Sequence, residues 1–477
     1  MMRALLVCLI TLLPVHLGAA PLPDTPFWQD CAVRIRSTPE VAAASPRKLC
    51  VDRENTVHVL TDRGLARVYG DTLALDRSYR PLAGRVPLDI ARSPDGDLGL
   101  LYEDGWLSNA RDGSLGARVP ARPGETLCLL PGDTAVLAIS GGLRWVPPAG
   151  HSPQTIQDFF KGTPRVLGLG TNECLAWDQQ GIVCLTWTNG PFPTRRWNVP
   201  LSGVQAAARD DRGNLILAGS NGVHRLDPRT GAGLPGWPAK LPVTHLTAAA
   251  AVPGGCWFGS TRGAFFAADA EGSSPAAPRY ATPEAPGIAP PAIRYYAGKR
   301  WLRDDQVLDL VVDRDGHVWI LTATGLNKIE FRRMTLADKA DWFHRKIRSQ
   351  NLRFGLTAER RMLTPGDPTS SEMIDTDNDG GWTSYYLGGL AARYAVTRDP
   401  EIRRQAWQSF SALERLQTIH RHAGFPARTI ERRGFKFSDV DRWRDAPDSG
   451  WEWKGHTSSD EIQAHAFAHA VMWELVA

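Results

Sequence analysis

Alternating carboxylates near the C-terminus form the first pattern that could do chemistry. Asp375, Asp377 and Asp379 precede Gly380, as in the first half of a calcium loop, where alternate carboxylates point inward and Gly allows a sharp turn. The twelfth position of that loop is Tyr386 instead of a bidentate Glu, which excludes an EF-hand and leaves a looser Ca2+ site. The alternative is a polar loop whose carboxylates favour the N-terminal dipole of the following helix.

Two further carboxylates, Asp460 and Glu461, join Asp379 as candidates for a catalytic acid or base. We favour Asp379, because a loop with the adjacent aromatic Trp382 suits a sugar site. Glu461 has a second explanation. The run from Ser458 to Glu461 is a Ser-x-x-Glu capping box, which starts a helix without any catalysis.

Side chains that could bind a substrate lie in three aromatic-rich loops, 375–386, 424–428 and 451–461. Arg428 could hold a uronate carboxylate in a bidentate pair or make a structural salt bridge. The aromatic and imidazole candidates for the same site are Trp382, Tyr386, Trp453 and His456.

Several classes of function lack their patterns in this chain. There is no Gly-rich phosphate loop, no Gly-x-Ser-x-Gly nucleophile elbow and no Cys/His nucleophile pattern. The net charge is +4, with 55 basic and 51 acidic side chains, so nothing suggests nucleic acid or a membrane surface as a partner.

Helices must position these loops, because helical periodicity takes over after Phe331. We predict helices at about 335–351, 382–397, 400–420 and 459–477. The third has a clear start, with Asp399 as N-cap and Pro400 at the first helical position. The second and third form an antiparallel hairpin, joined only by Arg398 and Asp399.

These tandem helical hairpins, with aromatic and charged loops between them, resemble part of an (α/α)-toroid. The segments 375–386, 424–428 and 454–461 are similar to an uncharacterised bacterial toroid domain of the six-hairpin glycosidase type. The resemblance implies a fold and cleft positions, and many toroids are glycoside hydrolases or polysaccharide lyases. A full toroid needs about twelve helices. We therefore expect a truncated domain, with an unpartnered apolar stripe of Ile462, Ala466, Ala470 and Trp473.

The first two thirds of the chain contain a repeat, a Gly followed by an apolar residue after a strand-like run. The members are Gly64-Leu65, Gly105-Trp106, Gly142-Leu143, Gly181-Ile182, Gly222-Val223, Gly263-Ala264 and Gly325-Leu326. Their steps are 41, 37, 39, 41, 41 and 62 residues. About 40 residues supply four strands per propeller blade, and the long last step indicates an insertion around 272–300. We predict a seven-bladed β-propeller over 21–335, followed by the helical domain over 336–477.

The best copy of the repeat resembles the two-component regulator propeller repeats, of pattern Asp-x-x-Gly-x-(apolar)-Trp-(apolar)-x-Thr-x-x-Gly-Leu. It runs from Asp313 through Gly316, Trp319 and Thr322 to Leu326. The resemblance implies a propeller. It does not imply signalling, because no transmembrane span, kinase or DNA-binding segment follows.

The N-terminus has the order of a secretory signal peptide over residues 1–20. Arg3 is followed by an apolar run from Ala4 to Leu13 and by the small residues Gly18 to Ala20. No other stretch reaches the apolar length of a membrane span. We therefore expect an exported protein, periplasmic or extracellular.

Removal of Cys8 with the signal peptide leaves six cysteines, an even number that favours disulfides in an exported protein. The pairs we predict are Cys174 with Cys184, at the two ends of one hairpin-like unit, and Cys31 with Cys50. The alternative is that these are buried free thiols in blade cores.

Two functions remain open. The first is an exported protein that binds complex carbohydrate or takes part in its processing, as a glycoside hydrolase or lyase if it is an enzyme. The second is a non-catalytic propeller that binds a protein partner or senses a ligand, since a fold alone does not define a function.

Overall fold

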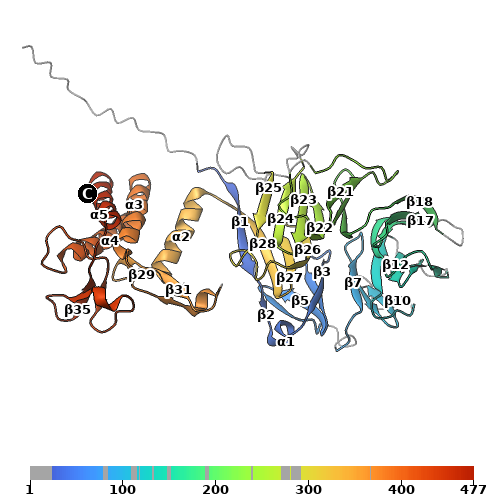
Figure 1. Cartoon of the computed structure of the whole chain (residues 1–477), viewed down its shortest axis with the longest axis horizontal. Helices are drawn as coiled ribbons and strands as arrows, with labels where there is room; N and C mark the ends of the chain where they lie inside the picture. The colour runs from blue at the N-terminus through green and yellow to red at the C-terminus, as the bar shows by residue number, and fades with distance from the viewer. Residues whose placement is uncertain are drawn as a thin grey trace, which may run out of the picture. The chain divides into compact units, whose positions relative to one another are not determined.

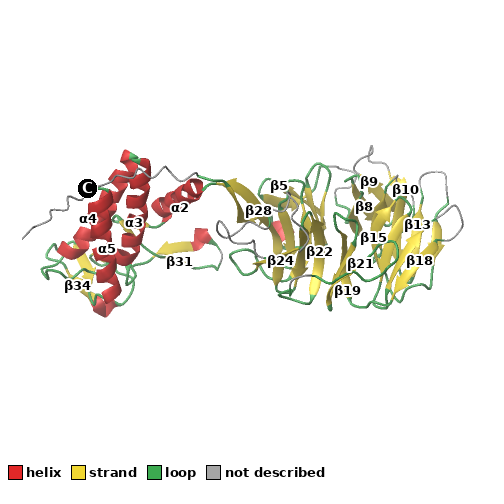
Figure 2. Cartoon of the chain, turned by 90° about the horizontal axis from the view of Figure 1, so that it is seen from above, coloured by secondary structure: helices red, strands yellow, loops and turns green. Residues whose placement is uncertain are grey.

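The computed structural model describes residues 24–78, 84–108, 115–117, 119–131, 134–147, 152–187, 193–237, 240–269, 280, 292–365 and 367–477. The signal peptide predicted over 1–20, and most of the insertion predicted around 272–300, lie outside these residues. The chain divides between Arg333 and Met334. Phe27–Arg333 is called the propeller unit below, and Met334–Ala477 the helical unit (Figures 1 and 2).

The described part of the propeller unit contains seven sheets, and in each of them three or four strands that follow one another along the chain are paired antiparallel. The first sheet comprises β3 Pro46–Val51, β4 Val57–Thr61, β5 Gly64–Tyr69 and β6 Thr72–Leu75, with β2 Arg36–Ser37 added in parallel to β6. The second comprises β7 Asp89–Arg92, β8 Leu98–Tyr102, β9 Gly105–Ser108 and β10 Leu115–Ala117. The third comprises β11 Thr126–Leu130, β12 Thr134–Ile139, β13 Gly142–Val146 and β14 Gln154–Ile156. A short helix, α1 Pro39–Ala42, precedes β3.

The fourth sheet comprises β15 Arg165–Gly170, β16 Glu173–Trp177, β17 Ile182–Thr186 and β18 Thr194–Val199. The fifth comprises β19 Val204–Arg209, β20 Leu215–Gly219 and β21 Gly222–Leu226. The sixth comprises β22 Leu246–Val252, β23 Gly255–Ser260, β24 Gly263–Ala268 and β25 Ile293–Tyr296. The last sheet combines both ends of the unit. Its strands are β26 Val307–Val312, β27 Val318–Thr322, β28 Gly325–Met334 and β1 Phe27–Arg34.

The sheets pack on one another in a closed circle. Each of seven apolar clusters joins one sheet to the next, and one of them joins Trp319 and Leu321 of the last sheet to Leu49 and Val59 of the first. Burial of both sheet faces explains why the second strand of a sheet is mostly apolar, as in β12 and β20. With β1 hydrogen-bonded to β28, this arrangement is a β-propeller (Figure 1).

The repeat motif is explained by hydrogen bonds that recur from sheet to sheet. At the Thr-x-x-Gly corner the hydroxyl donates to the carbonyl of the glycine three residues on, from Thr61 to Gly64 at 2.8 Å and from Thr322 to Gly325 at 2.9 Å. Asp313 accepts from the backbone of His317 and from the indole of Trp319, both at 2.8 Å. The motif therefore fixes its own turns.

The predicted disulfides are wrong for this structure, in which none of the six cysteines among the described residues is cross-linked. Cys174 is paired across the sheet with Leu185 and Cys184 with Leu175, so the two side chains point to opposite faces. Cys31 lies in β1, at the outer edge of the last sheet, whereas Cys50 lies in β3, the innermost strand of the first. Burial raises the pKa of both Cys50 and Cys184 to about 12.

The helical unit contains the four helices that we predicted, within three residues at each end. They are α2 Leu336–Gln350, α3 Asp379–Thr397, α4 Pro400–Thr418 and α5 Ser459–Leu475. Asp399 accepts a hydrogen bond from the backbone of Glu401 at 2.8 Å, which confirms it as the N-cap of α4. Among the described residues, no helix is both long and apolar enough to cross a membrane.

Short strands that the sequence did not reveal fill the connections. They are β29 Leu352–Arg353 with β30 Leu356–Thr357, β31 Arg360–Met362 with β32 Ser371–Met373, and β33 Ile430–Arg432, β35 Trp451–Lys454 and β34 Trp443–Asp445, together with the 3-10 turns Pro368–Ser370 and Val440–Arg442. The core of the unit lies between α3, α4 and α5 and includes Leu387, Leu390, Leu413, Leu416 and Met472.

Candidate functional site

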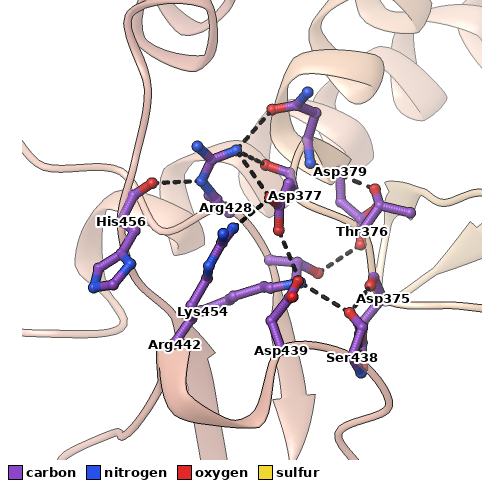
Figure 3. A network of polar contacts seen from close by, with 12 residues as sticks. Asp375, Thr376, Asp377, Asp379, Arg428, Ser438, Asp439, Arg442, Lys454 and His456 are labelled. Atoms are coloured by element: carbon purple, nitrogen blue, oxygen red, sulfur yellow. Dashed lines mark hydrogen bonds and ion pairs between the residues drawn. The ribbon is translucent and has the colours of Figure 1, made fainter.

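The three loops predicted to line a site do meet in the helical unit. The guanidinium of Arg428 donates to the backbone carbonyl of Asp377 at 2.7 Å and to that of His456 at 2.5 Å. The ammonium of Lys454 lies 2.8 Å from a carboxylate oxygen of Asp377 (Figure 3). Residues 375–386, 424–428 and 451–461 are thus held together by one polar network.

Lys454 lies at the centre of this network, and its side chain is completely buried. Its ammonium is 2.8 Å from Asp377 and 2.8 Å from Asp439, and donates to the hydroxyl of Ser438 at 2.9 Å. Burial of an ammonium is costly unless it is paired and hydrogen-bonded. The sequence analysis missed Lys454, Ser438 and Asp439, because no local motif marks residues that meet only in the folded chain.

Asp377 is the partly exposed carboxylate of the network. Its side chain also accepts a hydrogen bond of 2.6 Å from Arg442. Burial acts to raise the pKa of Asp377, but the hydrogen bond and charge of Lys454, with the charges of Arg428 and Arg442, outweigh it and lower that pKa. Asp377 is therefore a firmly ionised group whose charge is balanced by the protein.

The predicted calcium loop is wrong, because its three carboxylates contact separate partners. Asp375 accepts from the backbone and hydroxyl of Ser438, and Asp377 pairs with Lys454. Asp379 accepts from three side chains, Thr376 at 2.8 Å, Thr429 at 2.6 Å and Arg353 at 2.9 Å. In the described part of the chain, no group of three or more His, Cys, Asp or Glu side chains is placed to hold a metal ion.

Asp379 is also out of reach of a substrate. It is the first residue of α3, and its side chain has no solvent exposure. Burial raises the pKa of Asp379, against the opposing effects of Thr429 and Arg353. The three donors satisfy the carboxylate of Asp379, which therefore has a structural role.

Glu461 is a buried cap for a helix other than its own. One carboxylate oxygen accepts from the backbone N–H of Gly381, in the first turn of α3, at 2.9 Å. The other lies 3.5 Å from His465, whose ring is 3.1 Å from the side-chain amide of Gln417. The predicted capping box is wrong, because the side chain of Ser458 makes no cap to α5.

Asp460 is the exposed member of the three predicted catalytic carboxylates. A hydrogen bond from Ser458 lowers the pKa of Asp460, against the weaker opposing effect of burial. A lone ionised carboxylate can attract a cation or accept a hydrogen bond. General acid–base cleavage of a glycosidic bond needs a second carboxylate facing it.

The predicted binding residues divide into buried and exposed ones. Tyr386 is hydrogen-bonded to His344 at 3.1 Å, and Trp453 is buried with its ring centroid 4.3 Å from that of His420. Arg428 makes the structural contacts described above. His456 and Trp382 are exposed.

Trp382 belongs to a row of exposed rings that the sequence analysis did not single out. Its ring centroid is 6.4 Å from that of Tyr385, which is 6.4 Å from that of Phe467 on α5. The three residues are 43%, 63% and 44% exposed. We call Trp382, Tyr385 and Phe467 the ring series. The i, i+3 spacing of the first two on α3 is the one signal that could have found them.

Comparison with known proteins gives similarity of structure without similarity of sequence. No family model and no curated protein matches the chain. The extracellular domain of a putative hybrid two-component system from B. thetaiotaomicron matches with a TM-score of 0.48 and 14% identity, over 64% of this chain and 40% of that one. A streptogramin B lyase matches with a TM-score of 0.45 and 13% identity, over 64% and 98%.

A third similar structure, the WD40 β-propeller domain of Doa1, has a TM-score of 0.43 and 12% identity, over 64% of this chain and 97% of that one. The chain therefore spans less than half the length of the extracellular domain of the two-component system and nearly all of the other two chains. Likeness at this level carries no argument about ligand or activity. The β-propeller assignment rests on the sheet order and the closed circle of cores.

Proposed function

We propose that this chain is an exported, non-catalytic recognition protein that binds complex carbohydrate on the ring series of its helical unit. In this proposal the propeller unit is seven-bladed and the helical unit is of (α/α)-toroid type. The seven sheets with their seven connecting cores support the first of these assignments. The α3–α4 hairpin, with α5 packed on it, supports the second.

The observation that carries the proposal is the contrast between aromatic rings and carboxylates in one region. Trp382 is exposed only three residues beyond Asp379, which is wholly buried. The flat apolar face of a sugar ring packs on an exposed aromatic ring, and a row of such rings can contact successive sugars. Exposed apolar groups gathered in this way mark binding surfaces.

A catalytic function is less well supported. An acid or base must come within hydrogen-bonding reach of the bond it cleaves, and Asp379 and Glu461 are both buried and engaged with protein donors. A pair of facing, accessible carboxylates is needed for hydrolysis by the common mechanism. Binding without turnover fits this arrangement.

Export is supported by the order of charged, apolar and small residues at the N-terminus. A polysaccharide partner is compatible with a periplasmic or extracellular location. No observation on the chain favours nucleic acid as a partner.

The test is to measure, by affinity electrophoresis and calorimetry, the binding of the whole protein to a panel of neutral and uronate-containing polysaccharides. Trp382→Ala and Tyr385→Ala should each weaken binding by roughly three- to tenfold, since an aromatic contact contributes about 0.5–1.5 kcal/mol. Trp473→Ala is the matched control, because Trp473 is exposed on α5 outside the ring series.

The same preparations should release neither reducing ends nor unsaturated sugars. Unchanged binding by both ring variants would refute the assigned surface. Steady turnover that is lost in Asp460→Asn would refute the non-catalytic assignment.

A further inference from the structure

A group of charged residues gathers where the innermost strands of the propeller begin. The innermost strand of each sheet is called its inner strand, and Lys48, Asp89, Arg165 and Asp309 lie on β3, β7, β15 and β26. Each is one of the first three residues of its strand. Neighbouring inner strands contact one another around the ring, and Arg165 on β15 is hydrogen-bonded to Gln205 on β19. These residues therefore surround one end of the propeller axis.

Contacts between sheets tie the group together. Lys48 lies 2.9 and 3.0 Å from the two carboxylate oxygens of Asp89. Asp309 accepts from the backbone N–H of Leu49 at 2.9 Å, which brings it next to Lys48. Lys48 and Asp89 therefore form a satisfied ion pair, with Asp309 beside it.

Asp309 and Arg165 are different, because their hydrogen bonds are with uncharged groups. Asp309 accepts from two backbone N–H groups, those of Leu49 and Leu310, each at 2.9 Å. Arg165 donates to the backbone carbonyl and the side-chain amide oxygen of Gln205 on β19. In the described part of the chain, neither has an ion-pair partner within 4.0 Å.

The strands that carry these two charges, β15 and β26, lie on opposite sides of the ring of inner strands. Counting inner strands around the ring, β15 and β26 are three steps apart in one direction and four in the other. Burial raises the pKa of Asp309, against the hydrogen bonds from Leu49 and Leu310, the charge of Lys48 and, as the smallest effect, the charge of Arg165. Burial likewise lowers the pKa of Arg165, against the charge of Asp309.

We propose that this end of the inner strands is a binding site for a small zwitterion, a molecule with one ammonium and one carboxylate group, such as a free α-amino acid. Its ammonium would pair with Asp309, and its carboxylate would take a bidentate pair from Arg165. The four charges of the site sum to zero, so a ligand of no net charge fits it better than a simple anion or cation. This site is independent of the ring series.

The test is calorimetry and thermal shift on the whole protein with glycine, L-alanine and L-glutamine as probes, and with acetate and methylammonium as single-charge controls. The expected result is saturable binding by at least one zwitterion, with no saturable binding of either single-charge probe. Arg165→Gln and Asp309→Asn should each weaken zwitterion binding by about tenfold or more, because each leaves one ligand charge unpaired. Arg196→Gln is the control, since Arg196 lies on the outer strand β18 and pairs with Glu173.

Asp309→Asn could disturb folding, because Asp309 holds two backbone N–H groups. In that case Arg165→Gln decides the matter, since among the described residues Arg165 donates only to Gln205 and holds no backbone N–H group. Equal binding by wild type and Arg165→Gln would overturn the proposal. So would binding of acetate as tight as that of the zwitterions, or no binding by any of the three zwitterions at millimolar concentration.

Discussion

At the residue scale, the start of α3 depends on the absence of a side chain. A Cβ built on Gly380 would lie 1.9 Å from a carboxylate oxygen of Glu461 and 2.8 Å from Leu416. The glycine therefore makes room for the carboxylate that caps the helix through Gly381. This close approach explains why two consecutive glycines are helical here, although both have low helix propensity.

Gly380→Ala should consequently destabilise the helical unit by about 1–3 kcal/mol or more, the usual cost of overpacking a core. Gly389→Ala is the matched control on the same helix, because a Cβ there meets nothing within 4 Å. It should be neutral or stabilising by up to about 1 kcal/mol. Urea unfolding followed by far-UV circular dichroism measures both, and equal stability of the two variants would contradict the assignment.

Glu461 should behave as a cap and not as a proton donor. Glu461→Ala leaves the buried N–H of Gly381 without its acceptor and should cost about 1–3 kcal/mol. Glu461→Gln keeps an acceptor oxygen and should cost distinctly less. If the two substitutions were equally harmful to unfolding free energy, the charge would matter more than the hydrogen bond.

Asp377 should make the helical unit sensitive to acid. Because the pKa of Asp377 is lowered on folding, its ionised form stabilises the fold above the unfolded pKa of about 3.9. That contribution is lost as the pH falls through the lower folded pKa. The melting temperature of wild type should thus exceed that of Asp377→Asn at pH 6, and the gap should narrow toward pH 2. A constant gap across this range would exclude Asp377 as the titrating group.

At the scale of elements, α5 has one face in the core and one in solvent. Met472 is 2% exposed and Trp473, the next residue, is 80% exposed. The exposed side also carries Ile462, Ala466 and Ala470, the apolar stripe expected from the sequence. A helix this apolar on its outer face has a surface that other apolar groups can cover.

Substitutions of Met472 and Trp473 should have very different effects on the free energy of unfolding. Met472→Ala should cost about 2–5 kcal/mol because it opens a cavity between α3 and α5. Trp473→Ala should change the unfolding free energy by no more than about 0.5 kcal/mol, although it removes the larger side chain. Chemical denaturation gives both numbers, and the reverse order would mean that the exposed face of α5 is covered in solution.

The helices could be predicted because their signals are local. Apolar periodicity marked α4, and the Asp399-Pro400 signal placed its start to the residue. The start of α3 was placed three residues late, since Gly380 and Gly381 look like a loop until the distant Glu461 is seen to cap them. The seven-fold repeat was visible for the same local reason, since each Gly corner is built within four residues.

The sites could not be predicted in the same way, because they depend on residues far apart in sequence. Lys48 and Asp89 are 41 residues apart, and Leu49 and Asp309 are 260 apart. For the aspartates 375, 377 and 379, a local pattern predicted a shared site that the structure does not contain. Their spacing suggested convergence on a metal, yet each found a separate partner from residues 353–454.

At the scale of the whole molecule, the two units have cores of their own, and among the described residues the core of the helical unit runs from Leu356 to Val476. We expect each unit to survive separation. Limited proteolysis should leave stable fragments near residues 27–333 and 340–477, identified by mass. Rapid loss of the second fragment would show that the helical unit needs further support.

Removal of β1 should be far more damaging than its length suggests. A chain beginning at Ile35 lacks the partner of β28 and leaves that strand as a bare edge. We expect a lower melting temperature and aggregation of the propeller unit, whereas a chain beginning at Thr25 keeps β1 and should behave as wild type. Equal melting temperatures would mean that the pairing of β1 with β28 contributes little.

The pairing of β1 with β28 also determines when the last sheet can form during translation. Residues 27–34 leave the ribosome early, but their partners, residues 325–334, emerge about 300 residues later. Until then the first strand has no place in any sheet, and the growing ring has two open ends. Such a distant contact makes folding slow, and a pause in translation late in the chain would prolong the period in which an unpaired strand can join the wrong neighbour.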